Sequence, residues 1–369
     1  MYRQNQKSVK AKGCYPTNHI CSVCCIIPPH LLKEIAKRGT PQQSDWAFQS
    51  LTHSARIRGQ RDVLSLAPAS TTSGEKRRTI YDASQGTSLP GKLVRSEGDA
   101  PSNDPAVNEA YDAAGATFDF YKEAYQRNSV DARGLRLDST VHYNVNYDNA
   151  FWNGSQMVYG DGDGQIFTRF TKSIDVIGHE LTHGVTQYEA GLRYQNEPGA
   201  LNESMSDVFG SLVKQRVLNQ KAEQADWIIG AGLLVSSIKG VGIRSMKAPG
   251  TAYDDPVLGK DPQPAHLQNL YKGTDDNGGV HINSSIPNHA FYLAAIDIGG
   301  YAWEKTGKIW YITLQERLHP WSNFARAAYQ TISVAGELYG RGSKEQNAVR
   351  NGWKQVGVEP GLFPFIWYY

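Results

Sequence analysis

Hydrophobic positions follow two different patterns along the 369-residue chain. Residues 75–170 carry short apolar runs broken by turn residues, which are typical of strands; these runs are Thr79–Tyr81, Leu93–Arg95, Val141–Tyr147 and Met157–Tyr159. One helix is predicted among them, over roughly 105–125, where apolar side chains recur at helical spacing. From Ile174 onward helical spacing predominates, and it predicts helices over Ala200–Leu218, Asn288–Ile298, Thr306–Leu318, Ser322–Tyr339 and Ser343–Val356. A β-rich part followed by an α-rich part predicts an α+β fold with a cleft between two domains.

The first 74 residues have a different character. Residues 28–66 contain a short helical pattern with the apolar residues Leu31, Leu32 and Ile35, and predict a small helical module. Residues 67–74 are rich in Ala, Ser, Thr, Pro and Gly and predict an exposed linker. Composition leaves open whether the module is a permanent decoration or a removable segment. At the other end, residues 359–369 form an aromatic tail that we expect to pack back on the helical domain.

All four cysteines lie in the first 25 residues, at positions Cys14, Cys21, Cys24 and Cys25. Residues 1–27 are therefore predicted to be a cysteine-containing extension, and the bulk of the fold has no disulfide. Cys21 and Cys24 lack the second pair that a zinc or redox site requires, so a dispensable or redox-sensitive extension is favoured over a structural metal. The apolar run at residues 23–27 is shorter than the ~7–15 residues that a signal peptide requires, so no signal is recognised.

Charge and hydropathy exclude two classes of partner. The formal net charge is +2, which argues against nucleic acid or a membrane surface as the main partner. No apolar stretch approaches the ~20 residues that span a bilayer, so membrane insertion is not expected.

The strongest chemical signal is the pentad His179-Glu180-Leu181-Thr182-His183. Residues four apart on a helix lie on one face, so both imidazoles can reach one metal ion with Glu180 beside them. The alternative, two solvated or capping histidines, is disfavoured because apolar neighbours predict a helix here.

A catalytic zinc needs a third protein ligand and leaves its fourth position to water. The segment Asn202–Asp207 supplies two carboxylates, Glu203 and Asp207, which are four residues apart. If this segment is helical, one carboxylate can bind zinc while the other accepts the free N–H of a ligand histidine.

These segments resemble the thermolysin family of zinc proteases, in family order and over roughly residues 75–358. The resemblance is carried by the segments Asn149–Gly154, Gly160–Gly164, His179–His183, Gly191–Glu197, Asn202–Asp207 and Gly278–Asn283. The segment Pro28–Leu32 resembles the short propeptide of the protealysin-like subgroup. The resemblance implies a β-rich N-terminal domain over 75–185 that ends in the zinc helix, an α-helical C-terminal domain over 186–358, and a zinc site in the cleft between them.

The resemblance also implies the chemistry of that site. His179, His183 and Glu203 would bind one catalytic Zn2+, which lowers the pKa of its bound water and polarises the scissile carbonyl. Glu180 would take the water proton and deliver it to the leaving amine. Asp207 would support His179 from behind.

Three further residues are assigned to the site by the resemblance alone. His281 and Tyr194 match the donors that stabilise the tetrahedral oxyanion. Asp276 matches the carboxylate that orients the His281 imidazole. Spacing would not have selected them, because a lone histidine in a glycine-rich turn is more often structural.

Substrate binding is implied for two groups of residues. Asn149 and Ala150 match an edge strand that pairs with an extended peptide, and Arg244 matches the residue that grips the carbonyl just beyond the cleaved bond. The primed-side pocket, which implies cleavage before bulky apolar residues, matches Phe167, Phe170, Val176 and Ile243. Such a pocket separates similar side chains by only ~1–3 kcal/mol, so we expect broad specificity.

The double Ca2+ site of thermolysin is expected to be lost. Asp175 and Asp226 are retained, but Lys214, Ile228 and Ala231 stand where the family has acidic residues. A lysine ammonium cannot bind Ca2+, although it could lie between the two aspartates and neutralise them.

The whole sequence therefore predicts a neutral zinc metalloendopeptidase, made as a precursor with its own propeptide as intramolecular inhibitor. Its expected substrates are proteins and peptides, and we expect a monomer. The alternatives are an exopeptidase, for which no motif is found, and a catalytically silent peptide-binding member of the fold, which would have lost Glu180 or a ligand. The resemblance favours secretion, and the lack of a recognisable signal leaves a cytoplasmic precursor open.

Overall fold

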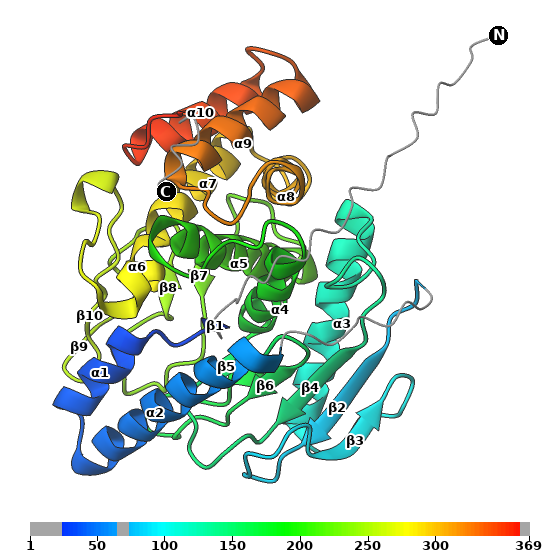
Figure 1. The fold of residues 1–369 in the computed structure, drawn as a ribbon, viewed down its shortest axis with the longest axis vertical. Helices are drawn as coiled ribbons and strands as arrows, with labels where there is room; N and C mark the ends of the chain where they lie inside the picture. Colours follow the sequence, from blue (N-terminus) through cyan, green and yellow to red (C-terminus); the bar gives the residue numbers. More distant parts are fainter. Residues whose placement is uncertain (1–23, 65–73, 362–369) are drawn as a thin grey trace.

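A six-stranded mixed sheet forms the framework of the N-terminal part in the computed structural model, which describes residues 24–64 and 74–361 (Figure 1). The strand order is β1-β5-β6-β4-β2-β3. The strands are β1 (Cys24–Cys25), β2 (Arg78–Asp82), β3 (Lys92–Ser96), β4 (Leu137–Val141), β5 (Ala150–Trp152) and β6 (Met157–Tyr159). β4 is parallel to β2 and β6, and the other pairs are antiparallel. β1 therefore covers the outer edge of β5.

Helix α3 (Pro105–Tyr125) packs against β2 and β4. Its first turn is well defined because the Asp104 side chain accepts from the amide of Ala106 at 2.9 Å and Pro105 occupies the first helical position. The predicted apolar positions, including Val107 and Phe118, are buried. The helix predicted over 105–125 is thus confirmed at both ends.

Helices α4 (Ile174–Tyr188) and α5 (Asn196–Val217) pack side by side and carry the predicted metal ligands. Gly210 of α5 lies directly against α4. A Cβ atom at this position would come within 2.4 Å of the Asp175 carbonyl oxygen and 2.9 Å of the His179 amide nitrogen. The glycine therefore lets the two helices approach closely enough for their side chains to share one site.

The C-terminal part is mainly helical, as Figure 1 shows in its upper half. Its later helices are α6 (Asp275–Asn283), α7 (Ser285–Ile298), α8 (Thr306–Glu316), α9 (Phe324–Tyr339) and α10 (Lys344–Gln355). Two short hairpin sheets precede α6: β7 (Ile228–Ile229) with β8 (Arg244–Ser245), and β9 (Asp254–Asp255) with β10 (Gly259–Lys260). The predicted α+β class, with a β-rich part before an α-helical part, is confirmed.

The N-terminal module consists of helices α1 (Pro29–Arg38) and α2 (Pro41–Leu64). Helix α1 lies beside α6 (Figure 1) and buries Leu31, Leu32 and Ile35, the residues of the predicted helical pattern. The chain between β1 and α1 is also buried, at Ile26 and Ile27. The module therefore packs on the peptidase part rather than projecting from it.

The strand predicted over Val141–Tyr147 is wrong beyond its first residue. Strand β4 ends at Val141, and the following residues His142, Asn144 and Asn146 have left-handed backbone angles, with φ of 53°, 58° and 50°. Asparagine tolerates this conformation because its short polar side chain can hydrogen-bond locally, so the segment turns instead of extending.

Several predicted segments lie wholly or partly outside the described residues: most of the extension with Cys14 and Cys21, most of the 67–74 linker, and most of the aromatic tail. The predicted domain boundaries stay predictions. Among the helices that the structure does describe, none is both long and apolar enough to span a bilayer.

Candidate metalloprotease active site

Three buried side chains from α4 and α5 converge on one point. The Nε2 atoms of His179 and His183 lie 3.0 Å apart. Each is 3.5 Å from a carboxylate oxygen of Glu203. Within the described residues, these are the three side chains whose ligand atoms gather closely enough to hold a metal ion.

Hydrogen bonds behind the two imidazoles fix which nitrogen faces the centre. The Nδ1 atom of His179 lies 2.8 Å from the Asp207 carboxylate, and that of His183 lies 2.8 Å from the Asn202 amide oxygen. Because both acceptors require an N–H at Nδ1, each neutral imidazole presents a lone pair at Nε2. Two lone pairs that face each other at 3.0 Å repel unless a cation lies between them.

The third ligand, Glu203, has a carboxylate oxygen that could bind a metal ion. Glu203 is fully buried, and its Oε2 atom has no hydrogen-bond partner in the part of the chain that the structure describes. Ligands around a tetrahedral zinc lie roughly 3.3 Å from one another, which the observed spacings of 3.0 and 3.5 Å approach. The two imidazoles and one carboxylate therefore fit a zinc ion.

The Asp207 carboxylate has three hydrogen-bond partners: His179, Arg244 and Asn288. Besides His179, it accepts two hydrogen bonds from Arg244, at 2.8 and 2.9 Å, and one from the Asn288 amide at 2.8 Å. Burial alone would raise the pKa of Asp207. The Arg244 guanidinium and His179 nevertheless hold this pKa well below its usual range. The Asp207 carboxylate therefore stays ionised beside the metal ligands.

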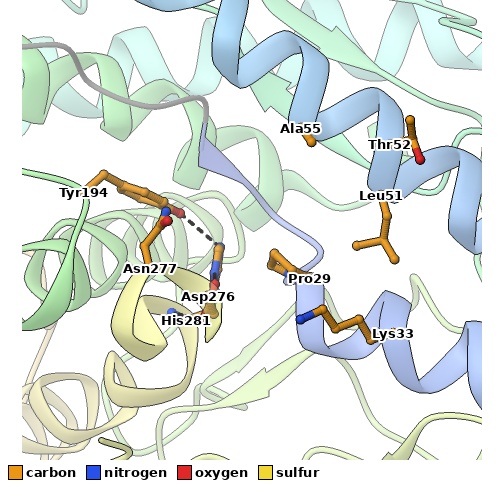
Figure 2. Close-up of a pocket in the computed structure, with 9 residues that line it drawn as sticks. All are labelled: Pro29, Lys33, Leu51, Thr52, Ala55, Tyr194, Asp276, Asn277 and His281. Carbon is orange, nitrogen blue, oxygen red and sulfur yellow. Dashed lines mark hydrogen bonds and ion pairs between the residues drawn. The ribbon is translucent and has the colours of Figure 1, made fainter. Parts of the chain in front are cut away.

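The His281 imidazole enters the site from α6. Asp276 binds it twice, since its carboxylate accepts from the His281 backbone amide at 2.9 Å and lies 2.6 Å from Nδ1. Burial alone would lower the pKa of His281, but the Asp276 carboxylate raises this pKa above its usual value. With Nδ1 bound to Asp276, a protonated Nε2 points to the Tyr194 hydroxyl, 3.1 Å away (Figure 2). The Tyr194 hydroxyl also donates to Glu203.

Glu180 lies beside the edge strand. It is fully buried, and its Oε2 atom accepts from the Trp152 amide of β5 at 3.0 Å. Asn149 and Ala150 at the start of β5 are buried as well, under the N-terminal segment. The structure therefore brings the predicted base, the metal ligands and the predicted peptide-binding strand together.

A cavity of about 410 Å3 opens between the N-terminal module and α6 (Figure 2). One wall is formed by Tyr194, Asp276, Asn277 and His281, and the other by Pro29, Lys33, Leu51, Thr52 and Ala55. The cavity therefore borders the His281 side of the site.

The structure buries the predicted pocket residues and pairs Lys214 with the two retained aspartates of the predicted calcium region. Phe167, Phe170, Val176 and Ile243 are all buried in the main core, which also includes Ile26. The Lys214 ammonium lies 2.9 Å from Asp175 and 2.9 Å from Asp226, and donates to the Ile228 carbonyl at 2.7 Å. Burial alone would lower the pKa of Lys214, but the Asp175 carboxylate raises this pKa, which keeps the ammonium charged.

Three supporting residues are absent from the sequence prediction. Asn202 and Ser206 both contact Nδ1 of His183, and Asn288 contacts Asp207. Asn202 and Ser206 could have been found, because they share the helix with Glu203 and Asp207 and lie on neighbouring turns. No local signal marks Asn288, which comes from the distant helix α7.

Comparison with known proteins gives this geometry a family. A profile described as the thermolysin metallopeptidase catalytic domain matches residues 63–187, and the profile of its alpha-helical domain matches residues 190–358. An extracellular metalloprotease of Pectobacterium carotovorum subsp. carotovorum is 51% identical over 338 residues, covering 91% of this chain and 97% of that protein. Thermolysin of Alicyclobacillus acidocaldarius subsp. acidocaldarius is 45% identical over 288 residues, covering 75% of this chain and 50% of its own length.

A solved structure extends the similarity to the N-terminal module. The precursor of protealysin, a metalloproteinase from Serratia proteamaculans, has a TM-score of 0.84 and 53% sequence identity, covering 91% of this chain and 99% of its own. The chain therefore belongs to the thermolysin family of zinc-dependent metalloproteases, in its protealysin-like subgroup, and is a metalloendopeptidase.

Proposed function

We propose that this protein is a neutral zinc endopeptidase that cuts on the amino side of bulky hydrophobic residues and is made as a self-inhibited precursor. The observation that carries the proposal is the convergence of His179, His183 and Glu203 beside the Glu180 carboxylate. Zinc bound there would lower the pKa of water and polarise the scissile carbonyl.

Glu180 is proposed as the general base and acid. Its hydrogen bond from the Trp152 amide holds the carboxylate beside the strand along which a substrate would lie. From this position Glu180 would accept the proton of the attacking water and later pass it to the nitrogen of the leaving amine.

His281 and Tyr194 are proposed to stabilise the oxyanion that water attack creates. Their polar atoms lie 3.1 Å apart, so both can reach one oxygen atom. Asp276 is proposed to hold His281 in position and in its protonated form, because it accepts from Nδ1 and from the backbone amide.

Substrate recognition is proposed to use the main chain first and one side chain second. Asn149, Ala150 and Arg244 would bind the backbone of an extended peptide. The buried apolar residues Phe167, Phe170, Val176 and Ile243 would receive the side chain after the cut bond. Because an apolar pocket discriminates by only ~1–3 kcal/mol, Leu, Phe and Ile should all be accepted.

Self-inhibition is proposed because the N-terminal region occupies this same place. β1 pairs with β5, the side chain of Asn149 binds the amide of Ile27, and Arg244 binds the carbonyl of Ile26. The precursor described for Serratia proteamaculans supports the same interpretation. The propeptide would have to leave before a substrate can bind.

The remaining proposals concern the state of the protein. The double Ca2+ site is proposed to be replaced by Lys214, whose ammonium occupies the space between Asp175 and Asp226. Secretion is proposed because relatives are named extracellular proteases. We also propose a monomer that does not bind nucleic acid. A catalytically silent binding protein is not favoured, because Glu180 and all three ligands are present.

Zinc content and peptide cleavage together test this function. The substrate is an internally quenched peptide with Leu after the scissile bond, and the wild type is compared with Glu180→Ala. We expect one zinc in both proteins and cleavage by the wild type alone. Zinc without cleavage, even after limited proteolysis of the N-terminal module, would favour the silent binding protein.

A further inference from the structure

Strand β1 (Cys24–Cys25) runs antiparallel to β5, and the chain then bends at Ile26 and Ile27 while it stays hydrogen-bonded to Asn149 and Ala150. The Ile26 amide donates to the Ala150 carbonyl at 3.2 Å, and the Ile27 amide donates to the Asn149 side-chain oxygen at 3.0 Å. Two successive carbonyls then meet two different groups. The Cys25 carbonyl lies 3.1 Å from Nε2 of His281, and the Ile26 carbonyl accepts from Arg244 at 3.1 Å.

We infer that the Cys25–Ile26 peptide bond occupies the position of a scissile bond, and that the protein cuts this bond in its own chain. The inference rests on the proposed function, in which His281 binds the carbonyl under attack and Arg244 binds the next one. Ile26 is then the residue after the cut, and it is bulky, apolar and fully buried, as the proposed specificity requires.

The prolines that follow oppose other registers. Pro28 and Pro29 have no amide hydrogen. If the chain moved by one residue so that Ile27 replaced Ile26, Pro28 would face Asn149 without a donor. A shift by two residues would leave the Ala150 carbonyl without its donor. A shift in the opposite direction would replace Ile26 by the smaller Cys25 side chain.

The cut needs a water molecule and a side chain that transfers a proton from this water to the leaving nitrogen. The hydroxyl of one water molecule is added to the carbonyl carbon of Cys25, and the bond from that carbon to the Ile26 nitrogen breaks. Glu180 takes one proton of the water and delivers it to the Ile26 nitrogen, and the second proton, left on the new carboxyl group, then also passes to that nitrogen, so the products are a Cys25 carboxylate and an Ile26 ammonium. The cavity that His281 and Tyr194 line borders this side of the cleft.

This cut would remove residues 1–25 and with them all four cysteines. The Cys25 side chain packs against Tyr143, Tyr147, Phe151 and Val158, so its thiol lies in an apolar cluster. Among the described residues, the metal-binding group does not include Cys25. The Cys25 carbonyl contacts His281 as the carbonyl of a substrate would.

The test follows the chain ends of the full-length, zinc-loaded protein by intact mass and N-terminal sequencing, at several protein concentrations. We expect a new chain that begins at Ile26, formed at a first-order rate independent of concentration and absent from Glu180→Gln. The inference is overturned if the wild type cleaves the quenched peptide but its first new N-terminus lies elsewhere. A rate that rises with protein concentration would also overturn it, because it would place the cut between molecules. Failure to cleave either peptide or chain would instead overturn the proposed function.

A second readout does not depend on turnover. Hydrogen exchange in Glu180→Gln, with zinc present or removed, should show the Ile26 and Ile27 amides protected by their bonds to Ala150 and Asn149. Ile26→Asp should abolish this protection and, in the active protein, slow the cut about 100-fold or more, since it would bury a charge. Phe48→Asp, at a position of α2 that is 66% exposed, is the matched control and should change neither. Exposed Ile26 and Ile27 amides in Glu180→Gln would contradict the docked register.

Discussion

Asp276 can bind His281 twice because of an unusual stretch of backbone. The four residues Asp276, Asn277, Gly278 and Gly279 all have left-handed angles, with φ between 53° and 85°. This turn folds the Asp276 carboxylate back over the start of the helical turn that carries His281. The imidazole is thus oriented by a neighbour only five residues away, and both its protonation and its direction depend on that neighbour.

Replacing Asp276 with Asn should therefore affect turnover more than binding. The amide keeps the size of the carboxylate but loses the charge that favours the imidazolium. We expect kcat of the processed enzyme to fall about 10–100-fold with little change in KM, which corresponds to one charge-assisted hydrogen bond of ~1.5–3 kcal/mol. Steady-state kinetics on the quenched peptide measure both constants.

Asp275→Asn is the matched control, because Asp275 is the adjacent residue and its side chain is 67% exposed. It should leave kcat within about twofold of the wild type. An equal effect of both substitutions would mean that the loop itself, and not the Asp276 carboxylate, is responsible.

The metal ligands were accessible to sequence reasoning because helical spacing determines which side chains share a face. His179 and His183 on one helix, with Glu203 and Asp207 on another, follow from that rule. His281 and Tyr194 do not, since their positions depend on left-handed turns and on the packing of distant segments. They could be assigned only by resemblance to a family.

Among the elements, α4 and α5 depend on a buried charge cluster as well as on close packing. Lys214 of α5 joins the start of α4, at Asp175, to Asp226 in the loop after α5. The Asp175 side chain is fully buried and that of Lys214 is 9% exposed. Removing one partner would leave the other charge buried without compensation.

Lys214→Met should consequently destabilise the fold by about 3–5 kcal/mol, measured by denaturant unfolding of the zinc-loaded protein. Lys305→Met is the control, because Lys305 forms an ion pair with Glu345 while its side chain is 50% exposed; we expect a much smaller loss of stability than for Lys214→Met. Added Ca2+ should not raise the melting temperature of the wild type. A clear rise would contradict the proposed replacement of the calcium site.

The segments that were not predicted correctly have one physical property in common: their conformation depends on turns or on distant partners. The segment after β4 looks like a strand because Tyr143 and Tyr147 alternate with polar residues, yet its asparagines adopt left-handed turns. β1 is two residues long and exists only because β5 offers it a partner. Local periodicity predicts long amphipathic helices such as α3 well, and it carries no information on pairings between residues more than 100 positions apart.

At the scale of the whole molecule, the N-terminal module and a peptide substrate would compete for one surface of the peptidase. Helix α1 contacts α6, and the ion pair of Lys33 with Asp275 links them at 2.8 Å. Because this pair is exposed, it contributes little, and the apolar residues Ile26, Ile27, Leu31 and Leu32 of the module are buried. Activity should therefore depend on loss of the module.

The full-length chain should be weakly active and should gain activity as its N-terminus is lost. Glu180→Ala should stay full length under the same conditions, because it lacks the group that moves the proton. Gel analysis and peptide cleavage, sampled over the same time course, test both statements. Full activity in a chain that remains intact would refute self-inhibition.

Acidity should weaken the docking of the module through His30. This residue is close to Asp276, His281, Arg244 and Glu34, and burial lowers its pKa from 6.5 to about 4. Its Nδ1 atom is buried and has no hydrogen-bond partner within the described residues. Since the undocked imidazole binds a proton more readily, docking is unaffected above pH 6.5 and is weakened as the pH falls from about 6.5 to about 4.

At pH 5.5 the loss should be about tenfold in the docking equilibrium. Hydrogen exchange of the Ile27 amide in Glu180→Gln measures it, with His30→Asn as the variant whose exchange should lose most of this pH dependence. A wild type and variant with the same pH dependence would rule out His30 as the cause.

The short edge strand also decides which proteins this enzyme can attack. β5 spans three residues and binds a chain through amides and carbonyls that must be free. In a natively folded protein these groups are already bonded within its own helices and sheets, so a segment must first open before it can be cut. Cleavage of folded proteins will then follow the free energy of local unfolding at each site, and the enzyme will act as a probe of conformational stability in its targets.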